Sequence, residues 1–165
     1  MTGREHHYRV TVRWTGNEGI GTASYRSYSR DHEISSPAVP DKPVLPGSSD
    51  PAFRGDPRRW SPEELYIAAL SACHKLWYLH LCANAGVVVE SYVDHAEGIM
   101  VEDETGGGQF TSVTLHPEIT ITRASDIEKA HALHHDAHAK CFLANSVKTP
   151  VIVEPIINAL DRQTG

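Results

Sequence analysis

Two of the three cysteines stand where a thiol reaction could use them. Cys73 lies midway along a segment of helical character, and Cys141 comes just after a second such segment. A thiolate is a strong nucleophile, and a second thiol at a flexible junction can close a disulfide with it. The pair therefore fits a thiolate and its resolving partner, although a single cysteine is more often a small buried apolar residue. Cys82 is expected in the core.

The helix that positions the first of these thiols has clear start signals. Ser61 can serve as the N-cap, Pro62 suits the first helical position, and Glu64 completes a capping box. The run from Leu65 to about position 85 is apolar on most faces, and the glycine that follows is a natural stop. A helix that is apolar nearly all round needs burial on nearly all sides, so we expect a second subunit to cover part of it.

The segment before this helix is predicted to contain two strands and a long loop. Apolar and polar residues alternate from Tyr8 to Trp14, which favours a half-buried strand, and a second strand is predicted at 21–30. Residues 35–60 contain six prolines and no periodicity. A loop of that length in a compact domain is usually functional, an arm that contacts a partner, or disordered.

The segment after the helix is predicted to alternate hairpin and helix. The expected elements are strands at 87–101 and 110–122, a helix at 126–140 and a strand at 147–153. Ser125 and Glu128 form a second capping-box pattern before that helix. The tail, residues 156–165, is expected to be loosely held. The order β-β-loop-α-β-β-α-β indicates an α+β fold with mainly antiparallel pairing.

Composition limits the classes of protein to which the chain can belong. Its 165 residues fit one domain, 1–165, with 40% hydrophobic and 22% charged residues and a net charge of −6. The charges are intermixed and form no basic patch of the kind that binds nucleic acid. No apolar run reaches the ~18 residues of a membrane span, and no signal peptide precedes the first strand. We therefore expect a cytoplasmic protein with no nucleic-acid or membrane partner.

The segment from Ser61 to Cys73 resembles a known family signature. Its sequence, SPEELYIAALSAC, is similar to the pattern of the OsmC/Ohr family, the osmotically inducible protein C and organic hydroperoxide resistance proteins. In that family a second cysteine follows some five dozen residues later, and here Cys141 follows Cys73 by 68 residues. The element order matches over roughly residues 8–153. The long 35–60 loop and the histidine-rich second helix place the resemblance in a less characterised OsmC-like branch.

The resemblance implies a reaction and a role for each site residue. Cys73 resembles the peroxidatic cysteine, Cys141 the resolving cysteine, and Glu63 the glutamate that pairs with an active-site arginine. We prefer Arg30 as that arginine, because a strand end is a firmer platform than a loop. Arg54 is the main alternative, and three other arginines remain open: Arg26, Arg58 and Arg59.

The family resemblance also implies the substrate, the reductant and the assembly. Relatives reduce organic hydroperoxides, use a dithiol such as dihydrolipoamide as reductant, and form intertwined homodimers. The expected chemistry needs no cofactor and no resident metal. An apolar pocket that admits alkyl chains is expected near the cysteines, from among Leu70, Leu76, Trp77 and Phe142.

Four histidines on the second predicted helix keep other interpretations open. His131, His134, His135 and His138 form a polar stripe that either faces solvent or shapes the peroxide site. With Cys141, His134 and His138 could also bind zinc. The alternative function is therefore a non-enzymatic module that binds a thiol or a metal. His74 and His80, on the first helix, are expected in packing or at an interface.

Overall fold

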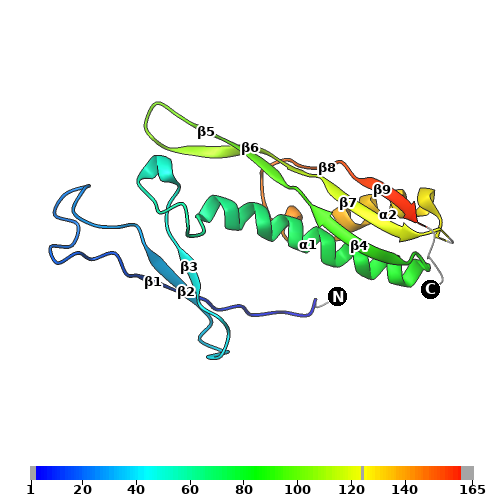
Figure 1. The fold of residues 1–165 in the computed structure, drawn as a ribbon, viewed down its shortest axis with the longest axis horizontal. Helices are drawn as coiled ribbons and strands as arrows, with labels where there is room; N and C mark the ends of the chain where they lie inside the picture. Colours follow the sequence, from blue (N-terminus) through cyan, green and yellow to red (C-terminus); the bar gives the residue numbers. More distant parts are fainter. Residues whose placement is uncertain (1–2, 124, 161–165) are drawn as a thin grey trace. The chain divides into compact units, whose positions relative to one another are not determined.

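The computed structural model of the protein describes residues 3–123 and 125–160 (Figure 1). By its internal contacts the described part of the chain forms two compact units, which divide between Leu65 and Tyr66. The elements, in chain order, are β1 (Thr11–Trp14), β2 (His32–Ser35), β3 (Leu45–Gly47), η1 (Pro51–Phe53), α1 (Pro62–Ala85), β4 (Val89–Asp94), β5 (Glu97–Glu102), β6 (Gly108–Leu115), β7 (Pro117–Thr122), α2 (Ile127–Lys140), η2 (Ala144–Ser146), β8 (Val151–Val153) and β9 (Ile156–Leu160). This is the mixed α+β class that the pattern predicted.

The first unit contains one antiparallel sheet in the order β1-β2-β3. The strand predicted at 21–30 is wrong. Gly21 has a positive φ of 56°, and the Ser27 hydroxyl donates to the Gly21 carbonyl at 3.0 Å, which folds this stretch into turns. The pairing strand is β2 instead. The predicted loop 35–60 also carries more structure than expected, because it holds β3 and η1.

The start and the stop of α1 are those that the sequence predicted. The Ser61 hydroxyl accepts from the Glu64 backbone N–H at 3.2 Å, and the Ser61 N–H donates to the Glu64 carboxylate at 2.8 Å. These two bonds are the capping box. Gly86 follows the helix with a φ of 75°, a conformation that glycine adopts without strain.

The second unit is built around a bent two-stranded ribbon (Figure 1). β5 and β6 form a hairpin, and the same two chain segments continue as β4 and β7, which also pair antiparallel. The single strands predicted at 87–101 and 110–122 are therefore each split. The break falls at His116, whose backbone N–H bonds the Asp94 carboxylate at 2.8 Å instead of continuing the ladder.

Each half of the ribbon gains a parallel third strand from the C-terminal segment. β8 pairs with β6, and β9 pairs with β7. The expectation of a loose tail from residue 156 is thus wrong for Ile156–Leu160, whose backbone completes the sheet. Residues 161–165 lie outside the described part of the chain.

The N-terminus of α2 also differs from its prediction. Asp126 is the N-cap, and its carboxylate accepts from the Lys129 N–H at 2.9 Å. Ser125 is used elsewhere, because its hydroxyl accepts from the Val88 N–H at 3.0 Å and lies 2.9 Å from the Thr122 hydroxyl.

From Tyr66 onward, α1 packs on two separate core clusters. Leu70 joins Val113 and Leu115 against β6 and β8. Farther along the helix, Tyr78 and Cys82 pack against β7 and α2. The expected burial on nearly all sides is not reached within this chain, since the Leu76 side chain is 63% exposed.

Candidate active site

The structure brings Cys73 and Cys141 together although 68 residues separate them. Cys73 is half-buried on α1, and Cys141 is 1% exposed at the residue that ends α2. Their side chains are near enough to interact by hydrogen bonding. No disulfide joins the three cysteines. Two neighbouring thiols, of which one is accessible, can form a disulfide once the accessible sulfur is oxidised.

The environment of Cys141 keeps its thiol protonated. Burial, followed by the interaction with the Cys73 side chain, raises the Cys141 pKa to about 11, against the opposing effect of the Ala144 and Leu143 backbone N–H groups. A thiol with that pKa is almost wholly neutral at pH 7 and a poor first nucleophile. Of the two cysteines, Cys141 is therefore the poorer first nucleophile.

Aromatic contacts hold the segment after α2 against α1. Phe142 meets Trp77 edge to face, with ring centroids 5.7 Å apart, and the Lys140 ammonium lies 5.7 Å from the Trp77 ring centroid. Lys140 was not among the candidates from sequence. No sequence pattern predicts the contact between Lys140 and Trp77. Trp77 lies four residues beyond Cys73, which is about one helical turn.

The apolar pocket expected around the thiols is only partly present. Leu76 and Trp77 line a shallow hollow of about 280 Å³ with His80, and Phe142 is exposed beside Trp77. Leu70 is 1% exposed and belongs to the core, so its predicted place in a pocket is wrong.

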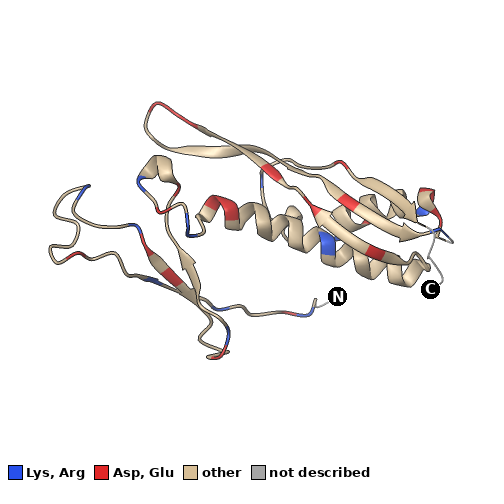
Figure 2. Ribbon diagram, in the orientation of Figure 1, with Lys and Arg blue, Asp and Glu red and all other residues tan. Residues whose placement is uncertain are grey.

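Basic residues are scarce on the helix that carries Cys73. Figure 2 shows acidic residues in the first turn of α1 and one basic position along it, which is Lys75. Residues two apart on a helix do not face each other, so Lys75 is poorly placed to stabilise a Cys73 thiolate. In that first turn, Glu63 has one carboxylate oxygen, Oε2, that is buried and finds no hydrogen-bond partner within the described residues.

Arg30 is anchored by two tyrosines of the first unit. Its guanidinium donates to the carbonyls of Tyr28 at 2.6 Å and Tyr25 at 2.7 Å, and lies 4.2 Å from the centroid of each ring. The predicted strand end is wrong, because Arg30 precedes β2 rather than closing a strand. Its platform is nevertheless firm, since two backbone bonds and two stacked rings hold the guanidinium.

The other arginines differ in whether they form an ion pair with a carboxylate. Arg59 pairs with Asp31 at 3.3 Å and Arg58 with Asp56 at 3.0 Å. Arg54 has a positive φ of 67° at the end of η1, and its guanidinium lies 6.0 Å from the Tyr25 ring centroid. Arg30 and Arg54 thus both lie near the Tyr25 ring. Contacts of Glu63, Arg30 or Arg54 with Cys73 stay predictions.

The histidines of α2 do not form one uniform solvent-facing stripe. His131 and His135 are exposed, but His134 is 4% exposed, and its Nδ1 lies 3.0 Å from His74 Nε2 of α1. The His134 ring also stacks on Tyr78, with centroids 3.8 Å apart. The expectation that His74 serves in packing is confirmed.

Burial keeps both histidines of this pair neutral. It is the first cause that lowers the His74 pKa to about 4, helped by the charge of His138 and opposed by that of Asp94. Burial likewise lowers the His134 pKa to about 3, helped by the charges of His74 and His131.

The described residues give the zinc alternative no support. In that part of the chain, no group of three or more His, Cys, Asp or Glu side chains is arranged to hold a metal ion. His134 turns toward α1, and Cys141 meets Cys73 instead. Cys82 is buried in the core, as expected. Nor does any described helix combine the length and apolar character that a membrane span requires.

The fold and the matched signature define a class of protein, the OsmC-like proteins. The model of the OsmC-like protein family matches residues 55–155, which include Glu63 and both site cysteines. A solved OsmC-like protein of unknown function from Vibrio cholerae is 31% identical, with a TM-score of 0.81 over 92% of this chain and all of that one. The chain therefore belongs to the OsmC-like family.

More distant solved structures share the fold. An organic hydroperoxide resistance protein from Elizabethkingia anophelis is 19% identical, with a TM-score of 0.65 over 95% of this chain and 100% of that chain. Another, from Bacillus subtilis, is 21% identical, with a TM-score of 0.61 over 93% of this chain and 98% of that chain. A search of curated protein sequences returned no match.

Proposed function

We propose that the protein is a thiol-dependent peroxidase that reduces organic hydroperoxides to alcohols. The observation that carries the proposal is the proximity of an accessible thiol, Cys73, to a buried one, Cys141, whose raised pKa keeps it protonated. Membership of the OsmC-like family and the fold shared with organic hydroperoxide resistance proteins support the choice of substrate.

The proposed reaction has three steps. The Cys73 thiolate attacks the outer peroxide oxygen, the O–O bond breaks, and the alkoxide takes a proton to leave as an alcohol while the sulfur becomes a sulfenic acid. The Cys141 thiol then forms an S–S bond with Cys73, and water leaves. An external dithiol, of the dihydrolipoamide type, reduces the disulfide by two exchange steps and is itself oxidised to a disulfide.

A guanidinium is proposed to hold the Cys73 thiolate. α1 places no basic side chain on the face of Cys73, and the unpartnered Glu63 oxygen is suited to accept from an arginine. Arg30 is the preferred donor because its position is fixed by Tyr25 and Tyr28. The exposed Leu76 fits the further expectation of a homodimer that covers α1.

Peroxide consumption by cysteine variants tests the proposal. Cys73→Ser should abolish dithiol-dependent turnover of cumene hydroperoxide, because a hydroxyl cannot replace the thiolate nucleophile at neutral pH. Cys82→Ser is the matched control and should keep the wild-type rate, since Cys82 lies in the core. Wild-type turnover by Cys73→Ser would overturn the proposed function.

A further inference from the structure

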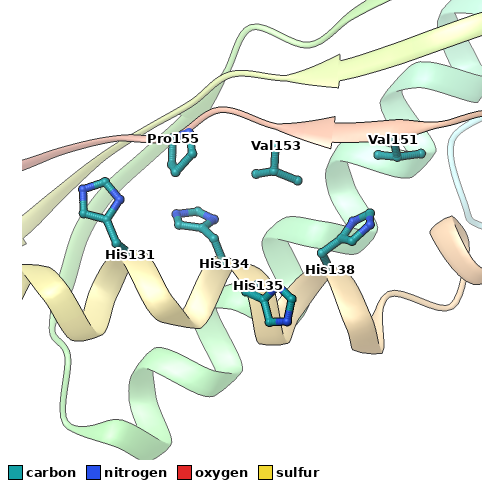
Figure 3. A pocket seen from close by; sticks show the side chains of 7 residues that line it. All are labelled: His131, His134, His135, His138, Val151, Val153 and Pro155. Atoms are coloured by element: carbon teal, nitrogen blue, oxygen red, sulfur yellow. The ribbon is translucent and has the colours of Figure 1, made fainter.

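A second cavity lies between α2 and the segment that carries β8. It has a volume of about 310 Å³ and is lined by four histidines of α2 on one side and by Val151, Val153 and Pro155 on the other. Figure 3 shows the rings of His131, His134 and His138 on the side of α2 that faces Val153 and Pro155. None of these residues takes part in the proposed thiol reaction.

Two ring nitrogens at this cavity are buried without a partner. His134 Nε2 and His138 Nδ1 have no hydrogen-bond partner within residues 3–123 and 125–160. The two histidines are four residues apart, so they lie on one face of α2. His134 is the stronger indicator, because it is 4% exposed and its other nitrogen is already occupied by His74. Buried polar atoms in folded proteins nearly always have a partner, so these two nitrogens indicate a bound molecule, a water or a ligand, that the protein does not itself supply.

The opposite wall limits what that molecule can be. Val151 and Val153 alternate along β8 and present methyl groups to one face, and Pro155 has no backbone N–H to donate. Water at this wall would lack hydrogen-bond partners. A molecule that fills the cavity should therefore have a polar end for the imidazoles and an apolar body for the valines.

The histidine pair also limits the head group. In the 3.0 Å contact between His74 Nε2 and His134 Nδ1 one nitrogen donates and the other accepts, so His134 Nε2 is either an N–H donor or a lone-pair acceptor. A hydroxyl both donates and accepts and can match either tautomer. A carboxylate only accepts, and an ammonium only donates. Burial lowers the His134 pKa to about 3, so this ring offers no positive charge to an anion at pH 7.

We infer that this cavity is a binding site for a small uncharged organic molecule with a hydroxyl head, an alcohol or a phenol. The hydroxyl lies between His134 Nε2 and His138 Nδ1, and the apolar body packs on Val151 and Val153. The inference is independent of the proposed peroxidase activity, because it uses neither cysteine.

Phenol is a suitable probe, with toluene and benzoate as matched compounds. In NMR titrations of the full chain, phenol should saturate a site with a Kd of at most roughly 10 mM, within the range open to so small a ligand. Nuclear Overhauser contacts should join its ring protons to the Val151 and Val153 methyl groups. Toluene, which lacks the hydroxyl, and benzoate, which is charged, should each bind about tenfold more weakly.

Variants connect that binding to the imidazoles. His134→Phe should weaken phenol binding about tenfold, since it removes the hydrogen bond and keeps a ring. His80→Phe, on α1 beside Asn84, is the matched control and should leave the Kd unchanged.

Three results would overturn the inference. The first is phenol contacts only at Trp77 and Phe142, and the second is equal binding of phenol and toluene. The third is Zn²⁺ bound by His134 and His138 in place of phenol. The nuclear Overhauser contacts of phenol in the wild-type protein test the inference even if His134→Phe does not fold.

Discussion

Two neighbouring residues of α1 each pair with a residue of the same type at or near α2, and the two pairs differ in how accessible they are. Cys73 meets Cys141, and His74 meets His134. Burial keeps a member of each pair neutral at pH 7, raising the pKa of Cys141 and lowering the pKa values of both histidines. One member of the thiol pair is accessible to solvent, whereas both histidines are buried, and Tyr78 stacks on one of them.

Burial alone therefore does not make a reactive site. A buried neutral group can take part in a reaction when a substrate can reach its partner and modify that partner chemically. Cys73 meets that condition, and His74 does not. The thiol pair is therefore expected to govern turnover, and the histidine pair to govern the stability of the fold against acid.

The largest expected effect is the loss of the resolving thiol. In Cys141→Ser, the Cys73 sulfenic acid has no partner, so turnover should stop after one peroxide per site. Trapping with dimedone followed by mass spectrometry should find the label on Cys73. Continued turnover at the wild-type rate would show that another thiol resolves the intermediate, and Cys82→Ser in the same background would identify it.

The next effect concerns the guanidinium that is proposed to hold the Cys73 thiolate. If Arg30 holds the thiolate, Arg30→Gln should move the alkylation of Cys73 to higher pH, because a close positive charge favours the thiolate. The rate of alkylation by iodoacetamide against pH reports this shift. Arg54→Gln is the matched control, since it removes the other guanidinium near Tyr25.

The reverse outcome would reassign the role. If the alkylation profile moves for Arg54→Gln and not for Arg30→Gln, the contact with the Cys73 thiolate belongs to Arg54. A profile that moves for neither indicates another cation, and Lys140, near Trp77, would be the next residue to replace.

The smallest effect is the acid sensitivity that the histidine pair should confer. In the folded protein the pKa values of His74 and His134 are about 4 and about 3, below the ≈ 6.5 of an exposed histidine. Below pH 6.5 the unfolded chain binds protons that the folded chain does not, so stability is retained above that pH and falls toward pH 4. Urea unfolding should show a loss of about 2–4 kcal/mol from pH 7 to pH 5.

Removing both imidazoles sharpens that test. The double variant His74→Leu/His134→Leu should lose most of the difference between pH 7 and pH 5, whatever its absolute stability. His80→Leu, an exposed histidine on the same helix, should keep the wild-type difference. An unchanged slope in the double variant would contradict the assignment of acid sensitivity to this pair.

Local signals predicted α1 well and the histidines poorly. The capping box of Ser61 and Glu64 depends on residues three apart, and it formed as predicted. The same pattern at Ser125 and Glu128 failed, because Ser125 is taken by Val88, 37 residues away. His134 is buried for a similar reason: the Tyr78 ring and His74 that cover it belong to α1, and no period along α2 reveals them.

Pairing of distant strands caused the other errors. A strand was predicted at 21–30, but the contact between the Ser27 hydroxyl and the Gly21 carbonyl folds this stretch into turns. No strand was predicted in the tail. Ile156–Leu160 forms β9 because it pairs in parallel with β7. The contact between the two cysteines was expected from the family resemblance alone, since α1 and the end of α2 meet only in the folded chain.

Cys73 and Cys141 are proposed to form one redox pair. The most direct test of this pairing is to treat the reduced wild-type protein with one equivalent of cumene hydroperoxide, without reductant, and to map the disulfides by mass spectrometry. We predict a loss of two hydrogen atoms per chain and a single linked peptide pair that joins Cys73 to Cys141. A disulfide that includes Cys82, or a chain left fully reduced, would show that Cys73 and Cys141 are not the redox pair.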